Sequence, residues 1–298
     1  VHESLTRLAL QRRSHVLCEK PVAATIQEAL AMVKAERESG GLSVAIGYQW
    51  SYSKAVQDLK RDILAGKFGR PRRLCTLVLW PRPKSYYQRS SWAGALKTAD
   101  GRWVLDSPAN NATAHYLHNM LYVLGSAAGS SAVPTEVAAF LGRAHPITNF
   151  DPGALRIMTD TGTEILFLCT HAVPDRVGPV FRYEFEKAEI RFDASTRERI
   201  VARFADGQTT DYGSPNADQG NKIWQSVDGV RTGARPLCGV EAAMMQTLCI
   251  NGAQDSMPDI VRFPASLVKV TEEKGDTLTW VDGLAETLTT CYEKGVMP

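Results

Sequence analysis

The segment His15-Val16-Leu17-Cys18-Glu19-Lys20-Pro21 decides the fold. Its first four residues form a short, largely apolar run, which is typical of a buried parallel strand. Thr25-Ile26-Gln27-Glu28 then forms a capping box at the start of a helix, which Gly40-Gly41 ends. Residues 42–47 predict the next strand. A strand, a helix and a strand with short connections predict a right-handed βαβ unit on a parallel sheet.

Ligands of such sheets bind beyond the carboxyl ends of the strands. Glu19 and Lys20 follow the first predicted strand, and Tyr48-Gln49-Trp50 follows the second. We therefore expect a ligand site beside these residues. Before the first strand, the pattern predicts an amphipathic helix that has Leu5 and Leu8 on one face.

The composition excludes several classes of protein. The chain has 298 residues, 44% hydrophobic and 22% charged, and its formal net charge is +2. This balance argues against a nucleic-acid partner held through its phosphates, and no run approaches the roughly 18 apolar residues of a membrane helix. The six cysteines lie far apart and form no CxxC pair. We therefore expect reduced, mostly buried thiols in a cytoplasmic protein and no metal site.

From about residue 71 the pattern changes to alternating strands with hairpin turns. Strands are expected at 74–80, 136–141, 155–159, 164–170, 180–186, 189–193, 200–205 and 209–212. Helices are expected at 53–64, 109–124, 242–249 and 284–292. The fold class is thus α/β and α+β: a parallel part followed by an open antiparallel sheet with helices on one face. We predict two domains, residues 1–50 and residues 51–298.

The predicted helix 109–124 carries the side chains of most chemical interest. Its apolar stripe consists of Leu117, Met120, Leu121 and Leu124. A polar stripe follows at spacings of four, three and four residues: Asn111, His115, His118 and Tyr122. Such a stripe is a solvated surface, a packed hydrogen-bond network or the wall of a catalytic site, and the residues alone favour the first two.

The order of these features resembles the Gfo/Idh/MocA oxidoreductases, the glucose–fructose oxidoreductase and inositol dehydrogenase group. The tripeptide Glu19-Lys20-Pro21, then Gly47-Tyr48-Gln49-Trp50, then a helix with His115 carry the resemblance, which covers essentially the whole chain. It implies that residues 1–50 are part of a dinucleotide-binding Rossmann domain. It also implies NAD or NADP as cofactor, a sugar, cyclitol or glycosyl derivative as substrate, and a homo-oligomer, either a dimer or a tetramer, through the open sheet of residues 51–298.

The resemblance also implies roles for single residues. Lys20, His115 and Asn111 are expected as catalytic residues, with His115 as general acid/base and Lys20 as its electrostatic partner. The expected cofactor contacts are Glu19, Lys20, Pro21 and Gln49, and the expected substrate contacts are Tyr87, Trp92, Asn111 and His115. A histidine can take up a hydroxyl proton near neutral pH, and a lysine ammonium can stabilise the alkoxide that develops.

The sequence departs from the family's pattern in two places. Asn111 stands where the family commonly has Asp, and an amide can orient a hydroxyl but cannot act as a base. Asp106, in the preceding loop, is a candidate for the missing carboxylate. Family members also begin with a glycine-rich phosphate loop, and no Gly-x-Gly-x-x-Gly occurs near the start of this sequence. We therefore expect two to three βαβ steps before Val1 and weak binding of a dinucleotide by this chain.

The leading hypothesis is an NAD(P)-dependent oxidoreductase. One alternative is a redox-assisted glycosidase, in which the cofactor oxidises and re-reduces the sugar during cleavage. The other is a non-catalytic regulatory protein that binds nucleotide or sugar, as a fungal transcriptional co-regulator of the family does. The presence of Lys20 and His115 favours an enzyme, whereas Asn111 leaves room for a binding role.

Overall fold

The computed structural model describes residues 1–273 and 275–298. Its N-terminal part contains α1 (His2–Gln11), β1 (Val16–Cys18), α2 (Ile26–Glu38) and β2 (Val44–Ile46). The two strands are parallel, with Val16 opposite Val44. The capping box is confirmed, because the Thr25 hydroxyl accepts a hydrogen bond from the Glu28 amide and the Glu28 carboxylate accepts one from the Thr25 amide. The predicted βαβ unit is therefore present.

The expectation of a buried first strand is wrong. Within the described residues β1 pairs only with β2, and the Leu17 side chain is 39% exposed. The expected apolar face of α1 is also outward, since Leu5 and Leu8 are about half exposed. Thr6 and Leu10 are buried instead, and Leu10 belongs to a core cluster with residues of α2. Sequence periodicity located the helix correctly but not the face that packs.

Nine strands form one large sheet in the order β10-β9-β8-β7-β3-β6-β5-β4-β11. Their bounds are β3 (Pro71–Leu79), β4 (Pro134–Arg143), β5 (Pro152–Thr159), β6 (Glu164–Thr170), β7 (Val177–Phe185), β8 (Ala188–Asp193), β9 (Ile200–Phe204), β10 (Thr209–Gly213) and β11 (Val261–Arg262). Only the β3–β6 and β4–β11 pairs of this sheet are parallel. The expected fold class, with a largely antiparallel second sheet, is confirmed.

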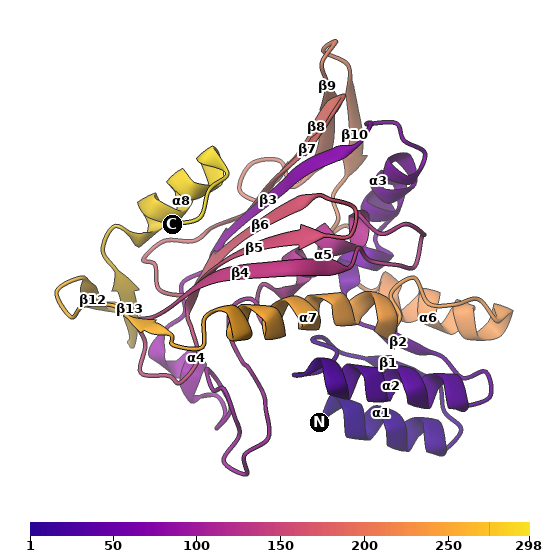
Figure 1. The fold of residues 1–298 in the computed structure, drawn as a ribbon, viewed down its shortest axis with the longest axis horizontal. Coiled ribbons are helices and arrows are strands. Elements are labelled where there is room, and N and C mark those ends of the chain that lie inside the picture. The colour runs from indigo at the N-terminus through magenta and orange to yellow at the C-terminus, as the bar shows by residue number, and fades with distance from the viewer. Residues whose placement is uncertain (274) are drawn as a thin grey trace.

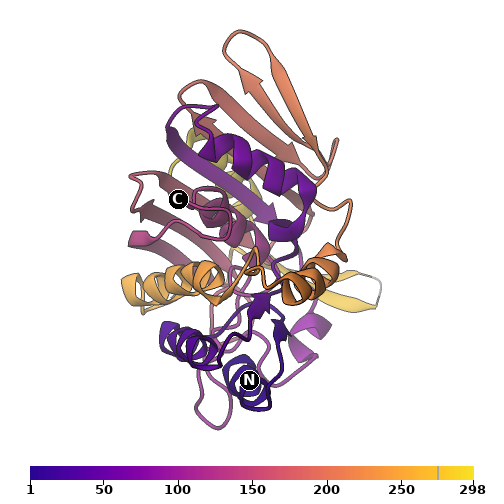
Figure 2. The same ribbon diagram turned by 90° about the vertical axis from the view of Figure 1, so that its right-hand side faces the viewer.

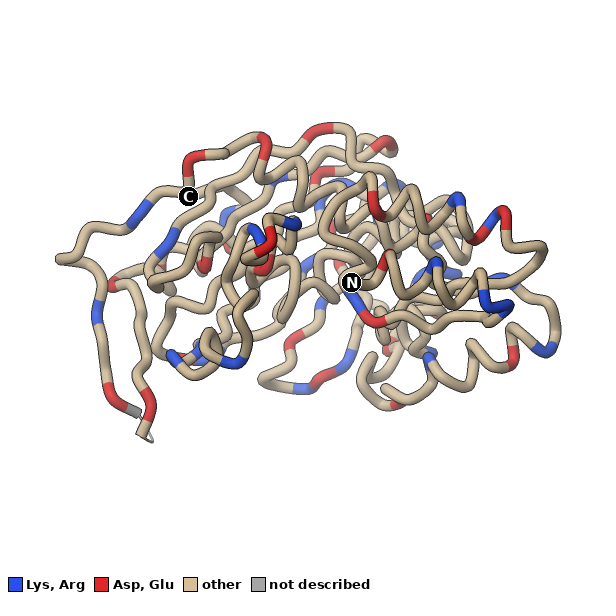
Figure 3. Tube along the Cα trace, turned by 90° about the horizontal axis from the view of Figure 1, so that it is seen from below, with Lys and Arg blue, Asp and Glu red and all other residues tan. Residues whose placement is uncertain are grey.

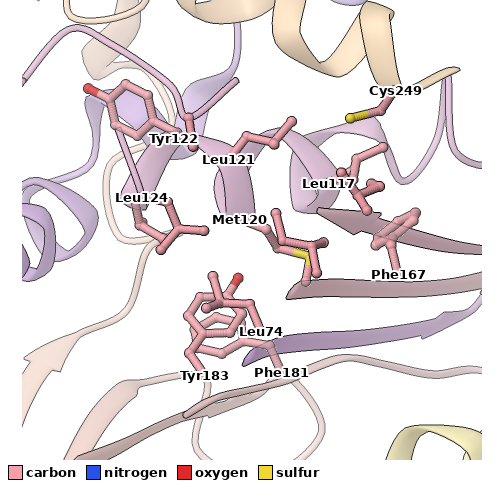
Figure 4. Packing of buried hydrophobic residues seen from close by; sticks show 14 of the residues in the cluster. Leu74, Leu117, Met120, Leu121, Tyr122, Leu124, Phe167, Phe181, Tyr183 and Cys249 are labelled. Atoms are coloured by element: carbon pink, nitrogen blue, oxygen red, sulfur yellow. The ribbon is translucent and has the colours of Figure 1, made fainter. Parts of the chain in front are cut away.

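Helices cover the large sheet on both faces. On one face, α3 (Lys54–Leu64), α5 (Ala114–Val123) and α7 (Val240–Ser256) share a core with the sheet (Figure 1). On the other face, α8 (Leu284–Lys294) packs with Cys75 and Leu77. Figure 4 shows Leu117 and Met120 of α5 pointing toward the sheet and Tyr122 pointing away from it. Helices on both faces correct the expectation of helices on one face only.

The remaining elements lie outside the large sheet. They are η1 (Gln49–Tyr52), α4 (Lys84–Gln88), α6 (Asn221–Thr232) and the hairpin of β12 (Val268–Glu273) and β13 (Asp276–Val281). The sequence did not predict α6. Together with α7, it lies between the N-terminal part and the large sheet (Figure 2). Asn221 and Gln225 of α6 donate side-chain hydrogen bonds to the Tyr52 carbonyl.

Charged residues of both signs occur along the whole trace (Figure 3). None of the helices in the described ranges is long and apolar enough to cross a membrane. Within residues 1–273 and 275–298, no three His, Cys, Asp or Glu side chains are placed together as metal ligands.

Candidate active site

Lys20 lies directly beyond the carboxyl end of β1, at the edge where parallel sheets bind their ligands. Its ammonium donates to the Asn111 carbonyl oxygen at 2.6 Å and lies 3.4 Å from the Asn111 side-chain oxygen. Partial burial lowers the pKa of Lys20, and the nearby charges of Glu19 and Asp106 oppose this shift. The ammonium is therefore held at the meeting point of two segments that are 91 residues apart.

Asn111 connects Lys20 to a buried carboxylate. The Asn111 amide nitrogen donates to Asp106 Oδ1 at 2.7 Å, and the Gly94 amide donates to Asp106 Oδ2 at 2.6 Å. Burial raises the pKa of Asp106, while the hydrogen bonds from Gly94 and Asn111 counteract this effect. The Asp106 carboxylate is thus linked to Lys20 through the side chain of Asn111.

His115 lies in the first turn of α5 and is partly buried. Its Nδ1 is buried and has no hydrogen-bond partner in the described part of the chain. Burial, followed by the positive charges of Lys20 and Lys222, lowers the pKa of His115 to about 3. The imidazole is therefore neutral at neutral pH, and it keeps a free nitrogen beside a lysine ammonium.

The rest of the polar stripe is a packed hydrogen-bond network. His118 and Tyr122 are buried, and His118 Nε2 lies 3.0 Å from the Ser51 hydroxyl. The Tyr122 hydroxyl donates to the carbonyls of Ala128 and Leu237 and accepts from the Gln57 amide. Asn111 is not in the helix as expected, because α5 begins at Ala114 and residues 108–113 form turns. Only the N-terminal end of the stripe faces the candidate site.

The expected cofactor contacts lie on one edge but are held in different ways. Glu19 is largely exposed, and it forms an ion pair at 2.5 Å with Lys222 of α6. The Pro21 carbonyl lies 2.7 Å from His2 Nδ1. Gln49 begins η1 and forms no hydrogen bond with Lys20 or His115 in the described structure. Sequence reasoning missed Lys222, for which no local motif gives a signal.

The expected substrate contacts Tyr87 and Trp92 lie in the segment that also holds Asp106. Trp92 is 38% exposed and stacks with Arg89, whose guanidinium lies 3.7 Å from Asp106. The Tyr87 hydroxyl is buried without a hydrogen-bond partner in residues 1–273 and 275–298. The Tyr87 ring packs against His145, which sequence reasoning read only as a dispersed histidine.

Comparisons with known proteins show what the N-terminal segment is similar to. Residues 1–48 match the Gfo/Idh/MocA family model, described as an oxidoreductase family with an NAD-binding Rossmann fold. Over 70 residues the chain is 37% identical to inositol 2-dehydrogenase 4 of Saccharopolyspora erythraea and 34% identical to the inositol 2-dehydrogenase of Salmonella typhimurium. These matches cover 24% of this chain and 21% of each relative. The chain thus aligns with about a fifth of the length of these curated relatives.

Solved structures share the fold over most of the chain. The WlbA dehydrogenase from Bordetella pertussis, solved with NADH and UDP-GlcNAcA, superposes with a TM-score of 0.69 at 21% identity. That likeness covers 87% of this chain and 74% of the other. The UDP-N-acetylglucosamine 3-dehydrogenase GnnA from Acidithiobacillus ferrooxidans has a TM-score of 0.66 at 18% identity, covering 86% and 74%. Residues 1–48 thus match the Gfo/Idh/MocA oxidoreductase family model, and the chain shares its fold with these solved structures over most of its length.

Proposed function

We propose that this chain is an NAD(P)-dependent oxidoreductase that transfers a hydride between a nicotinamide and a sugar, cyclitol or glycosyl derivative. The observation that carries the proposal is the meeting of the Lys20 ammonium with Asn111, one turn before the unpartnered His115. The proposal is supported by relatives named as inositol 2-dehydrogenases and by a fold neighbour solved with NADH.

The residues present suit the nicotinamide end of the cofactor. When bound, the nicotinamide supplies the hydride acceptor. We propose that Glu19, Lys20, Pro21 and Gln49 hold it at the carboxyl end of β1. The buried, unpartnered Nδ1 of His115 fits a polar ligand at this edge, because buried polar atoms are nearly always hydrogen-bonded. The sequence contributes no Gly-x-Gly-x-x-Gly loop for the pyrophosphate.

Lys20 is suited to bind the reacting hydroxyl and to stabilise negative charge on its oxygen. An ammonium has three N–H donors, and the carbonyl and side-chain oxygens of Asn111 engage two at most. A donor therefore remains for a substrate oxygen. Because the site is partly shielded from water, a positive charge there favours the alkoxide more strongly than it would in bulk solvent.

His115 is suited to take the hydroxyl proton. With a pKa lowered to about 3, it is neutral at neutral pH and its free nitrogen can accept a proton. A base of such low pKa is weak against an ordinary alcohol. As the hydride leaves the carbon, however, the hydroxyl becomes strongly acidic, and a weak base then suffices. We therefore propose that proton and hydride leave together.

Asn111 and Asp106 are positioning residues in this proposal. The amide of Asn111 cannot act as a base, but its hydrogen bond to Asp106 fixes which side of the amide faces Lys20. The buried negative charge of Asp106 also offsets the positive charge of Lys20. The carboxylate that the family commonly carries at the position of Asn111 is thus supplied from the preceding loop.

The test is production of reduced nicotinamide from a panel of inositols, sugars and nucleotide sugars. NAD+ and NADP+ are supplied at millimolar concentration, so that turnover is detected even at low cofactor affinity. Lys20→Met should lower turnover by about 10²- to 10³-fold, as loss of a charge-stabilising donor does. Lys34→Met, at an exposed lysine of α2, should leave it unchanged. Nucleotide binding without turnover on any member of the panel would instead indicate a regulatory binding protein.

We also propose a cytoplasmic homo-oligomer divided into domains at residues 1–50 and 51–298. All six cysteines are free thiols, which fits a reducing compartment. The sheet face beneath α8 carries the ion pairs Arg182–Glu184 and Arg191–Glu189, so an interface there would be polar. Sedimentation at several concentrations measures the state of assembly, and a monomer throughout would contradict this part of the proposal.

A further inference from the structure

The large sheet ends beside the candidate site in a group of arginine and aromatic side chains. Leu79 of β3 lies opposite Thr170 of β6 and Val177 of β7. The residues just beyond these positions therefore share one edge of the sheet. A hydrogen bond of 2.7 Å between His171 Nδ1 and the Trp80 carbonyl holds two of them together.

Arginines and aromatic rings alternate along this edge. We call this row the arginine ladder; it consists of Arg176, Trp80, Arg82, Tyr86, Arg89 and Trp92. The guanidinium carbon of Arg176 lies 4.1 Å from the centre of the Trp80 ring, and that of Arg82 lies 5.7 Å from the same ring. Trp80 thus contacts a guanidinium from each of two strand ends.

The ladder continues toward the candidate active site. The Tyr86 ring centre lies 4.9 Å from the guanidinium carbon of Arg82 and 3.7 Å from that of Arg89. Arg89 in turn lies 5.1 Å from the Trp92 ring. Stacking on aromatic faces orients a guanidinium while leaving its N–H edge free to donate.

The ladder has more positive charge than its neighbours neutralise. Among the side chains that the structure describes, no carboxylate lies within 4 Å of Arg82 or Arg176. Asp106 is 3.7 Å from Arg89, but its oxygens already accept hydrogen bonds from Gly94 and Asn111. Asp175, next to Arg176 in sequence, is exposed and forms no ion pair in the described structure. The ladder therefore has an unused capacity for an anion.

Unpartnered polar atoms are found in the same corner. Arg82 Nε, the Tyr87 hydroxyl, His145 Nε2 and His171 Nε2 are all buried, and the described residues offer them no hydrogen-bond partner. His145 and His171 are themselves almost completely buried. His171 Nδ1 donates to the Trp80 carbonyl, and burial lowers the pKa of His171 to about 3, so its Nε2 accepts, whereas Arg82 Nε donates. Because buried polar atoms in native structures are nearly always hydrogen-bonded, this corner is suited to a ligand that carries hydroxyl groups as well as acceptor oxygens.

We infer that the arginine ladder binds an anionic group of the substrate, so that the substrate is an acidic or phosphorylated sugar or cyclitol. This inference rests on the proposed function. Arg89 contacts Asp106, which holds Asn111 and through it Lys20, so the ladder leads directly to the reacting groups. The planar fork of a guanidinium matches a carboxylate or a phosphate with two parallel hydrogen bonds.

The test is calorimetric titration of the protein with glucuronate, glucose 6-phosphate and neutral glucose. We expect one of the two anionic probes to bind at least tenfold more tightly than glucose, and the better one identifies the group as carboxylate or phosphate. Arg82→Gln and Arg89→Gln should each weaken that binding by about 10- to 100-fold, the effect of losing a charge-assisted hydrogen bond. Arg203→Gln, at an exposed arginine of β9, is the matched control and should change nothing.

Two results would overturn the inference: equal affinity for glucose and both anions, or unchanged anion affinity in both ladder variants. Neither result bears on hydride transfer to neutral polyols, which the nicotinamide assay measures separately. Conversely, tight anion binding that the ladder variants abolish, with no reduced nicotinamide from any substrate, would support the ladder and contradict the proposed function.

Discussion

The two ends of the polar stripe along α5 bring together the same kinds of residue for different purposes. At one end Lys20 meets Asn111, next to His115. At the other end Lys60 lies 3.7 Å from the centre of the Tyr122 ring, next to His118. Sequence spacing cannot tell these ends apart. What distinguishes them is burial: Lys60, His118 and Tyr122 are almost completely buried, whereas Lys20 and His115 are only partly buried.

The Lys60 end is closed to solvent, although His118 Nδ1, like His115 Nδ1, is buried without a hydrogen-bond partner in the described residues. Lys60 is 1% exposed and donates to the Ser130 carbonyl, while the Tyr122 hydroxyl has three protein partners. At the Lys20 end, His115 Nδ1 has no hydrogen-bond partner in residues 1–273 and 275–298. An unpaired polar group on a partly exposed residue such as His115 is available for a substrate. A paired one contributes to stability.

Replacing each histidine in turn tests whether one end of the stripe is catalytic and the other structural. His115→Ala should lower turnover by about 10²- to 10⁴-fold, because a general base is lost, with little effect on stability. His118→Ala should lower the free energy of unfolding by about 2–4 kcal/mol, because a buried ring leaves a cavity. The His118 ring stacks on the Tyr48 ring, and the two ring centres are 3.9 Å apart. The absorbance of reduced nicotinamide measures turnover, and urea titration measures the free energy of unfolding.

The two ends would not differ as proposed if His118→Ala lowered turnover and His115→Ala lowered stability. His118→Ala should keep turnover within a few-fold of the wild type once the protein is folded. A loss of turnover from His118→Ala as large as that from His115→Ala would mean that the whole stripe lines the site. His118→Asn, which retains a hydrogen-bonding side chain, serves as the second variant if the alanine variant does not fold.

Local signals in the sequence were sufficient for most of the framework. The capping box at Thr25 and the Asp160–Thr163 turn involve residues close together in the chain, and both are confirmed. The edge position of Lys20 follows from strand polarity alone. Resemblance to the family, rather than periodicity, selected His115 from the four members of the stripe, and its role stays a prediction.

The remaining features depend on contacts between distant segments. The division of the stripe is set by Ser51 and Cys238, which close the His118 end from two separate parts of the chain. The pairing of Glu19 with Lys222 spans 203 positions and requires α6. Its apolar residues Ile223, Val227 and Val230 stand at helical spacing but are exposed, and this helix was not predicted from the sequence. The buried face of α1 was predicted wrongly for the same reason, since the segments that pack against a helix decide which of its faces is buried.

The stability of the protein should depend on pH through Lys60 at the closed end. Burial lowers the pKa of Lys60 to about 7, whereas an unfolded lysine titrates near 10.5. Between these values the unfolded chain binds a proton that the folded chain has released, so stability should increase as the pH rises. The slope is up to about 1.4 kcal/mol per pH unit, and because the folded lysine is half ionised at pH 7.0, the increase between pH 7.0 and 8.5 is about 1.6 kcal/mol.

Urea unfolding at these two pH values measures the change. Lys60→Met should remove the increase, because the variant has no group to titrate. Lys54→Met, at an exposed lysine of the same helix, should retain it. Equal slopes in the wild type and Lys60→Met would show that the Lys60 ammonium is better solvated than its burial indicates.

The smallest expected effect tests whether the closed end is purely structural. Tyr122→Phe removes the hydroxyl that accepts from Gln57 and donates to the carbonyls of Ala128 and Leu237. The free energy of unfolding should fall by about 1–2 kcal/mol, because buried partners lose a hydrogen bond. Tyr292→Phe, whose hydroxyl forms no hydrogen bond in the described structure, should change it little. Turnover should be unchanged in both, and a tenfold loss in Tyr122→Phe at full stability would extend the reacting site along all of α5.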